Sequence, residues 1–149
     1  MKKFFCSLFI LFSLTGFSQE LKWETDLDTA KNKAQKEGKN ILMYFTGSDW
    51  CAPCKALKKD FFYSEKFAEK AESVVLLMID LPFRNDIITP EQRVKNKAVD
   101  KKYNSERSYP LLVGIDANGT ILNSISAYSS FNTYHDTSAH FKFLESITE

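Results

Sequence analysis

Two cysteines, Cys51 and Cys54, are the residues of this chain whose types and spacing are best suited to chemistry. A cysteine thiolate attacks disulfides, and a second thiol three residues later can displace the partner from the mixed disulfide so formed. If a helix begins at Cys51, one turn of it holds both sulfurs within bonding reach. Unpaired backbone N–H groups and the helix dipole would then stabilise the Cys51 thiolate and lower the pKa of that thiol.

The same pair also fits other uses. A structural staple across so short a loop would constrain the unfolded chain very little, which favours a redox couple. Zinc would need two more ligands, and the only histidines are His135 and His140. We expect them on different faces of one helix, as solvated positions or rim contacts. A cysteine hydrolase would need a histidine beside Cys51, and no local signature supplies one. We therefore expect a redox pair with no metal and no cofactor.

The segments around the pair are expected to place it at the edge of a sheet. Residues 41–46 form a continuous apolar run, which predicts a strand buried on both faces, and Thr46-Gly47-Ser48-Asp49 predicts the turn after it. Cys51 then lies at the carboxyl end of a central strand and at the start of a helix. In open α/β sheets, this is the edge where sites gather.

The rest of the chain predicts alternating strands and helices that make one three-layer α/β/α domain. We expect the Phe61, Phe62 and Phe67 cluster to lie in the core of this domain. The predicted elements are a short edge strand at 21–25, a helix capped by Asp26 or Asp28 and ended by Gly38, helical pattern from Cys54 to about Ala71 with a break near Ser64, a strand at 74–79, a polar helix at 90–103, a hairpin of 110–115 and 120–125, and a last helix at 134–147.

Two motifs together carry a family resemblance. Asp49-Trp50-Cys51-Ala52-Pro53-Cys54-Lys55 follows a predicted buried strand, and Tyr109-Pro110 opens a strand of the predicted hairpin. The chain resembles the thioredoxin family over nearly all of residues 20–149. The resemblance implies the thioredoxin fold, an α/β/α sandwich with a central mixed sheet, and a cis peptide bond before Pro110 that lies against the cysteines. The segments 46–50 and 81–98 are closer to exported thioredoxin-like proteins than to cytosolic thioredoxin.

The resemblance also implies roles for individual residues. Cys51 is the attacking sulfur and Cys54 the more buried, resolving one. Pro110 and the backbone of Tyr109 position an extended substrate chain beside Cys51, and Trp50 offers a flat apolar contact. Two simpler explanations stay open, in which Trp50 is an ordinary core aromatic and Lys55, instead of favouring the thiolate, is a solvated helix lysine.

One residue between the cysteines indicates the direction of exchange. Pro53 recurs at this place in reducing thioredoxins, whereas oxidants and isomerases typically have a histidine there.

One feature departs from the family. Thioredoxin keeps a buried acid on the strand before the motif, and this strand offers only Met43-Tyr44-Phe45. We expect Asp49 and Asp80, the nearest acids in sequence, to be turn and strand-end residues, so we predict proton transfer by another route and slower exchange.

The first residues predict a secretory signal at 1–18, followed by the domain at 19–149. Met1-Lys2-Lys3 is basic, residues 4–14 are apolar but too few to span a bilayer, and Gly16-Phe17-Ser18 offers small residues for cleavage. The short apolar segment argues against an uncleaved anchor helix, and the position of Cys6 within it argues against a lipid anchor. We therefore expect an exported protein, periplasmic or secreted, without stable membrane insertion after cleavage.

Charge and compartment restrict the partners. The chain carries 20 Lys and Arg against 19 Asp and Glu, so nothing in its balance attracts nucleic acid. We expect disulfide-containing protein substrates and a membrane-bound electron donor, because an oxidising compartment would otherwise keep the pair as a disulfide. The predicted function is thiol–disulfide exchange on exported proteins in the reducing direction. The alternatives are a non-catalytic binding module of the same fold, and an oxidase or isomerase with a higher reduction potential.

Overall fold

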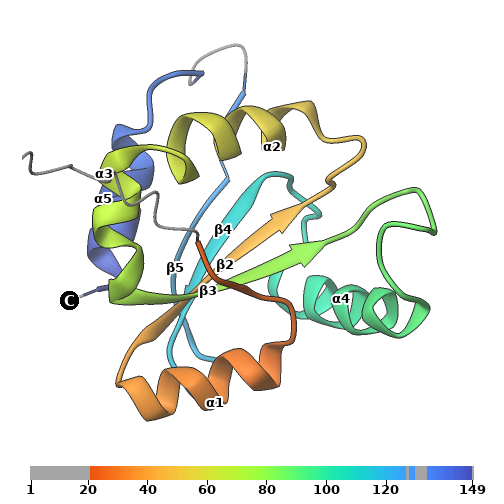
Figure 1. Cartoon of the computed structure of the whole chain (residues 1–149), viewed down its shortest axis with the longest axis horizontal. Helices are drawn as coiled ribbons and strands as arrows, with labels where there is room; N and C mark the ends of the chain where they lie inside the picture. The colour runs from red at the N-terminus through yellow and green to blue at the C-terminus, as the bar shows by residue number, and fades with distance from the viewer. Residues whose placement is uncertain (1–20, 127, 130–133, 149) are drawn as a thin grey trace, which may run out of the picture.

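A five-stranded mixed sheet forms the centre of the molecule (Figure 1). The computed structural model describes residues 21–126, 128–129 and 134–148. The strand order is β1-β3-β2-β4-β5, with β2 parallel to β3 and antiparallel to β4. The strands are β1 (Trp23–Glu24), β2 (Asn40–Thr46), β3 (Val74–Asp80), β4 (Leu111–Ile115) and β5 (Ile121–Ile125).

Helices cover both faces of the sheet, which confirms the three-layer architecture. On one face lie α1 (Leu27–Glu37) and α4 (Pro90–Tyr103). On the other lie α2 (Ala52–Leu57), α3 (Glu65–Lys70) and α5 (Ser138–Ser146), together with a π-helical turn η1 (Lys58–Phe62) and a 3₁₀ turn η2 (Ala71–Ser73). The central strand β2 is buried on both sides, as its continuous apolar sequence predicts.

Local capping signals set the helix boundaries. The Asp26 carboxylate accepts a hydrogen bond from the backbone of Thr29 at the start of α1, and Gly38 ends that helix with φ +64°. The predicted break after α2 falls at Ser64, whose hydroxyl caps α3. Thr89 caps α4, with Pro90 in the first helical position that proline favours.

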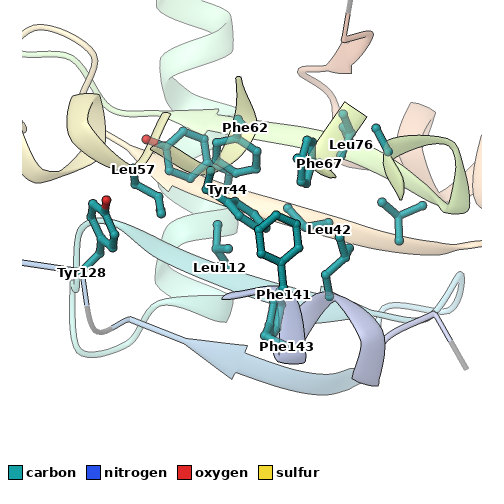
Figure 2. Close-up of a cluster of buried hydrophobic side chains, with 14 of the residues drawn as sticks. Leu42, Tyr44, Leu57, Phe62, Phe67, Leu76, Leu112, Tyr128, Phe141 and Phe143 are labelled. Carbon is teal, nitrogen blue, oxygen red and sulfur yellow. The ribbon is translucent and has the colours of Figure 1, made fainter. Parts of the chain in front are cut away.

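Aromatic rings fill the core between the sheet and the α2, α3 and α5 layer (Figure 2). Phe61, Phe62 and Phe67 are fully buried, which confirms their expected place. The Phe61 ring lies 4.8 Å from that of Phe67 and 4.9 Å from that of Phe141, measured between centroids. These contacts join the segment after α2 to α3 and α5, and the Phe62 ring, 4.8 Å from that of Tyr44 on β2, packs the same segment against the sheet.

The expectation that one helix carries both histidines, as solvated positions or rim contacts, is wrong in two respects: His135 is solvated but lies outside the helix, and His140 is buried. α5 begins at Ser138 rather than at 134, so His135 precedes it, with an exposed side chain and φ +69°. His140 is only 2% exposed and lies between the rings of Phe61 and Tyr128. The sequence pattern around α5 did not show this, because the burial of His140 depends on rings contributed by distant segments.

His140 should make stability depend on pH. Burial lowers its pKa below the ordinary 6.5, and the Asp136 carboxylate opposes this less strongly. Above pH 6.5 the imidazole is neutral in both the folded and the unfolded state. Below pH 6.5 the unfolded chain takes up a proton before the folded protein does, so the free energy of unfolding decreases as pH falls. In the His140→Phe variant this contribution is absent. Below pH 6.5 we therefore expect its free energy of unfolding to fall less steeply than that of the wild type, by at most about 1.4 kcal/mol per pH unit.

Urea unfolding at pH 7.5 and 5.5 measures this difference. The variant Ala139→Gln, at an exposed position of the same helix and without a titratable group, is the matched control and should keep the wild-type pH slope. An unchanged slope in His140→Phe would show that other groups determine the acid sensitivity.

The predicted signal at 1–18 and the domain boundary at 19 lie outside the described residues. Within the described part of the chain, no helix combines the length and apolar character needed to cross a bilayer.

Candidate active site

The cysteine pair lies at the start of α2, as expected. Cys51 is the residue before the first helical turn, and its sulfur accepts a hydrogen bond from the backbone N–H of Cys54 at 3.2 Å. The two cysteines form a disulfide with their Cα atoms 5.2 Å apart. An N–H group directed at the Cys51 sulfur at a helix start is an arrangement that stabilises negative charge on that atom in the reduced form.

Burial does not distinguish the two cysteines. Cys51 is 2% exposed and Cys54 is 1% exposed. Cys54 is thus the more buried cysteine, as expected, but the difference in exposure is too small to separate their roles. Position separates them instead, because Cys51 precedes the helix while Cys54 lies within its first turn. Access to Cys51 therefore depends on the side chains and loops around the start of α2.

The peptide bond between Tyr109 and Pro110 is cis, as the resemblance implied. Pro110 is buried directly before β4, whose first residue Leu111 pairs with Phe45 near the end of β2. The Tyr109 hydroxyl donates to the Asp100 carboxylate at 2.8 Å. Burial, and then this carboxylate, raise the pKa of the Tyr109 phenol, so that it remains a hydrogen-bond donor.

Trp50 joins the cysteine motif to the loop after β3. Its indole N–H donates to the carbonyl of Leu81 at 2.9 Å. Its ring stacks on Phe83 with centroids 5.0 Å apart and meets the edge of Tyr109 at 5.3 Å. Phe83 is 76% exposed, whereas Trp50 is half-buried and packs against the core, so the three rings form an aromatic rim where the core meets the surface.

Comparison with known proteins identifies the family. The model of a thioredoxin-like family matches residues 22–117. This chain belongs to that thioredoxin-like family. It is 35% identical over 100 residues to the disulfide bond reductase DsbH of Chlamydia pneumoniae. That match covers 66% of this chain but only 58% of the relative, less than two thirds of its length.

Solved structures agree with this assignment. A DsbH oxidoreductase superposes with a TM-score of 0.73 at 28% identity, covering 86% of this chain and 85% of that one. A thioredoxin from Thermus thermophilus gives a TM-score of 0.59 at 18% identity, covering 84% and 85%. A putative disulphide-isomerase from Bacteroides thetaiotaomicron gives 0.56 at 20% identity, covering 80% and 88%. The last two similarities concern the thioredoxin fold alone.

Two further residues of the thioredoxin-like motif lie on α2. Pro53 is half-buried in the first turn of α2. Backbone N–H groups in this turn have no partner within the helix, so proline, which lacks one, is tolerated there. Lys55 is exposed and takes part in no ion pair among the described residues. Its backbone N–H donates to the carbonyl of Cys51 at 3.2 Å, while its charged side chain is held by no ion pair beside the cysteines within the described residues.

The acids nearest in sequence bind backbone groups, as expected. The Asp49 carboxylate accepts hydrogen bonds from the N–H groups of Phe83 at 3.0 Å and Arg84 at 2.9 Å. Asp80, at the end of β3, accepts from the N–H of Ser48 at 2.9 Å. Both carboxylates therefore bind backbone N–H groups of loops. Their hydrogen bonds connect the turn before Cys51 to β3 and to the segment after it. Sequence reasoning did not foresee this link, which joins positions far apart in the chain.

A phenol on β2 reaches toward the cysteines where thioredoxin has a carboxylate. The buried Tyr44 hydroxyl donates to the carbonyl of Cys54 at 2.8 Å. Burial raises the pKa of Tyr44, so the group stays protonated. Its partner is a backbone oxygen and not a sulfur. Tyr44 therefore holds α2 on the sheet. A tyrosine in an apolar strand was the only sign of this contact in the sequence.

Proposed function

We propose that this protein is a thiol–disulfide oxidoreductase that reduces disulfides in exported proteins through Cys51 and Cys54. The observation that carries the proposal is a bridged cysteine pair at the start of α2, beside the aromatic rim and the Tyr109–Pro110 bond. The family membership and the similarity to a disulfide bond reductase support it.

The reaction moves two electrons from the reduced pair to the substrate. The Cys51 thiolate attacks one sulfur of the substrate disulfide; the other leaves as a thiolate and takes up a proton. Cys54 then loses its proton and attacks the Cys51 sulfur. This step closes the Cys51–Cys54 disulfide and releases the second substrate thiol. The pair ends in the oxidised form, so each turnover needs two electrons and two protons from a donor.

Neighbouring residues are proposed to orient the substrate and tune the pair. Pro110 and the Tyr109 backbone would hold an extended chain alongside Cys51, and Trp50 would supply a flat apolar contact for it. Pro53 favours the reducing direction. Lys55 contributes at most a weak electrostatic effect on the thiolate, because its side chain is exposed to solvent.

The proposed location is outside the cytoplasm, either periplasmic or secreted, which the basic and apolar pattern of residues 1–18 supports. In such a compartment the pair would remain oxidised without a source of electrons. A membrane-bound electron donor is therefore part of the proposal, and disulfide-containing proteins of the same compartment are its substrates.

Two measurements on the reduced protein test this function. Iodoacetamide labelling of Cys51 against pH should show a thiol pKa clearly below that of free cysteine, about 8.5. Equilibration with dithiothreitol should place the potential near the thioredoxin value of about −270 mV rather than the oxidant value of about −120 mV.

Other results would select another function. An ordinary thiol pKa together with no reduction of 2-hydroxyethyl disulfide would indicate a non-catalytic binding module. A markedly higher potential with retained exchange would indicate an oxidase or isomerase.

A further inference from the structure

A groove opens beside the aromatic rim, between α4 and the loop that follows β3. It encloses about 980 Å³. Its lining comes from the aromatic rim of Trp50, Phe83 and Tyr109, from the loop after β3 at 81–83, and from α4 and the segment after it. Figure 1 shows the loop after β3 and α4 on the same side of the sheet. The groove therefore begins at the residues that surround the cysteine pair and leads away along α4.

Basic side chains also line the groove. They are Arg93, Lys97, Lys101 and Arg107, and the sole acid among the lining residues is Asp100. The Asp100 carboxylate already accepts from the hydroxyl of Tyr109 and the amide of Asn104. The groove thus carries a local excess of positive charge on a chain whose formal net charge is only +1.

Three of these cations form no ion pair with the described residues of the protein. Lys97, Lys101 and Arg107 are exposed, and none of them forms an ion pair within the described part of the chain. Lys97 and Lys101 stand four residues apart on α4, which puts them on the same face of that helix. Their charges are available to a ligand rather than neutralised by the protein.

The loop wall of the groove is fixed by the protein itself. The Arg93 guanidinium donates to the carbonyls of Pro82 and Arg84, and the buried Asn96 amide donates to the carbonyl of Asp80. The bonds made by Asp49 and Trp50, described above, hold the same loop from the other side. A groove held in this way needs little ordering when a ligand binds, which favours affinity.

Arg107 is held in an uncommon backbone conformation. Its φ is +53°, in the left-handed region that long side chains seldom adopt. Its N–H donates to the carbonyl of Asn104 at 2.9 Å, and the buried Asn104 side chain bonds both backbone groups of Ser108. This turn directs the chain into Tyr109 and Pro110 and places the arginine on the groove.

We propose that this groove binds an acidic, extended segment of the substrate protein that flanks the disulfide attacked by Cys51. The inference rests on the proposed function and adds the substrate class. Carboxylates of the segment face Lys97, Lys101 and Arg107, while an apolar side chain contacts the exposed face of Phe83. Charge complementarity of this kind acts mainly on the rate of encounter and on selection among partners, and it is weakened by salt.

Two disulfide-bonded peptides test the proposal, identical except for aspartates or lysines flanking the cysteine. At low ionic strength we expect the wild-type protein to reduce the acidic peptide about fivefold faster than the basic peptide. The preference should shrink in about 0.5 M salt, where the Debye length is below about 5 Å. The double variant Lys97→Glu, Lys101→Glu should reverse the preference. Lys36→Glu, Lys142→Glu makes the same change in net charge on α1 and α5 and should keep it.

The neutral substrate 2-hydroxyethyl disulfide separates the groove from the chemistry. Both double variants should reduce it at the wild-type rate. Equal rates on the two peptides, or one preference shared by both double variants, would overturn the groove proposal. If the wild-type protein fails on 2-hydroxyethyl disulfide, the proposed function fails instead. Equilibrium binding of serine-substituted forms of the two peptides, followed by tryptophan fluorescence, then decides whether the groove prefers acid.

Discussion

The Cys51→Ser variant is expected to lose disulfide reduction completely, and Cys54→Ser to stop halfway with its substrate attached. A serine hydroxyl at 51 stays protonated and cannot replace the thiolate that begins the reaction. With Cys54 replaced, the first attack still forms a mixed disulfide, but no thiol follows to release the substrate. Incubation with a disulfide-bonded protein, followed by non-reducing electrophoresis and mass spectrometry, measures both outcomes.

The full chain contains one more cysteine, so both variants are made with Cys6→Ser. The Cys6→Ser chain alone should reduce substrate at the wild-type rate, and the Cys51→Ser, Cys54→Ser combination should capture nothing. A covalent complex in Cys51→Ser, or multiple turnovers in Cys54→Ser, would contradict the assigned order of attack. In cell envelopes the same trap would identify the physiological partner.

Gly47→Ala is expected to disrupt the aromatic rim. A Cβ atom at Gly47 would lie 2.1 Å from Cε2 and 2.3 Å from Nε1 of the Trp50 indole. The ring would have to move, breaking its bond to Leu81 and its stacking on Phe83. Overpacking of this kind destabilises by about 1–3 kcal/mol. We expect that loss in urea unfolding, together with a higher KM for protein substrates.

A double-mutant cycle isolates the cause. In the Trp50→Leu background the added methyl group meets no indole, so Gly47→Ala should then have little further effect on unfolding free energy. An equal loss in both backgrounds would place the damage in the backbone of the turn and not in the rim.

Local signals in the sequence accounted for much of the fold. The cap at Asp26, the restart at Ser64 and the proline that opens α4 act through neighbouring residues, so their effects were predictable. The central strand was predictable because its apolar sequence is unbroken. The start of α5 was misplaced: Thr137, directly before the helix, makes no side-chain cap, and the N–H of Ser138 instead donates to the Asp136 carboxylate at 3.0 Å.

The site was predictable to a similar degree. Cys51 at a helix start and the Tyr109–Pro110 bond followed from motifs, and the structure adds that Trp50 contacts Tyr109. The bonds from Tyr44 to the Cys54 carbonyl and from Asp49 to Phe83 and Arg84 were not predictable, since each joins side chains and backbone groups through tertiary folding. The basic groove was hidden for the same reason, because its cations come from α4 and from the loop after it.

Asp49 ties the loop after β3 to a position only two residues before Cys51. The wall of the groove and the cysteine pair are therefore linked by two hydrogen bonds and a short stretch of chain. Thermodynamic coupling is reciprocal, so if the reduced and oxidised forms differ in affinity for an occupant of the groove, that occupant changes the equilibrium constant for reduction by the same factor, and the potential by its logarithm. A substrate held more weakly once the bridge closes would, by this connection, be released as a consequence of its own reduction.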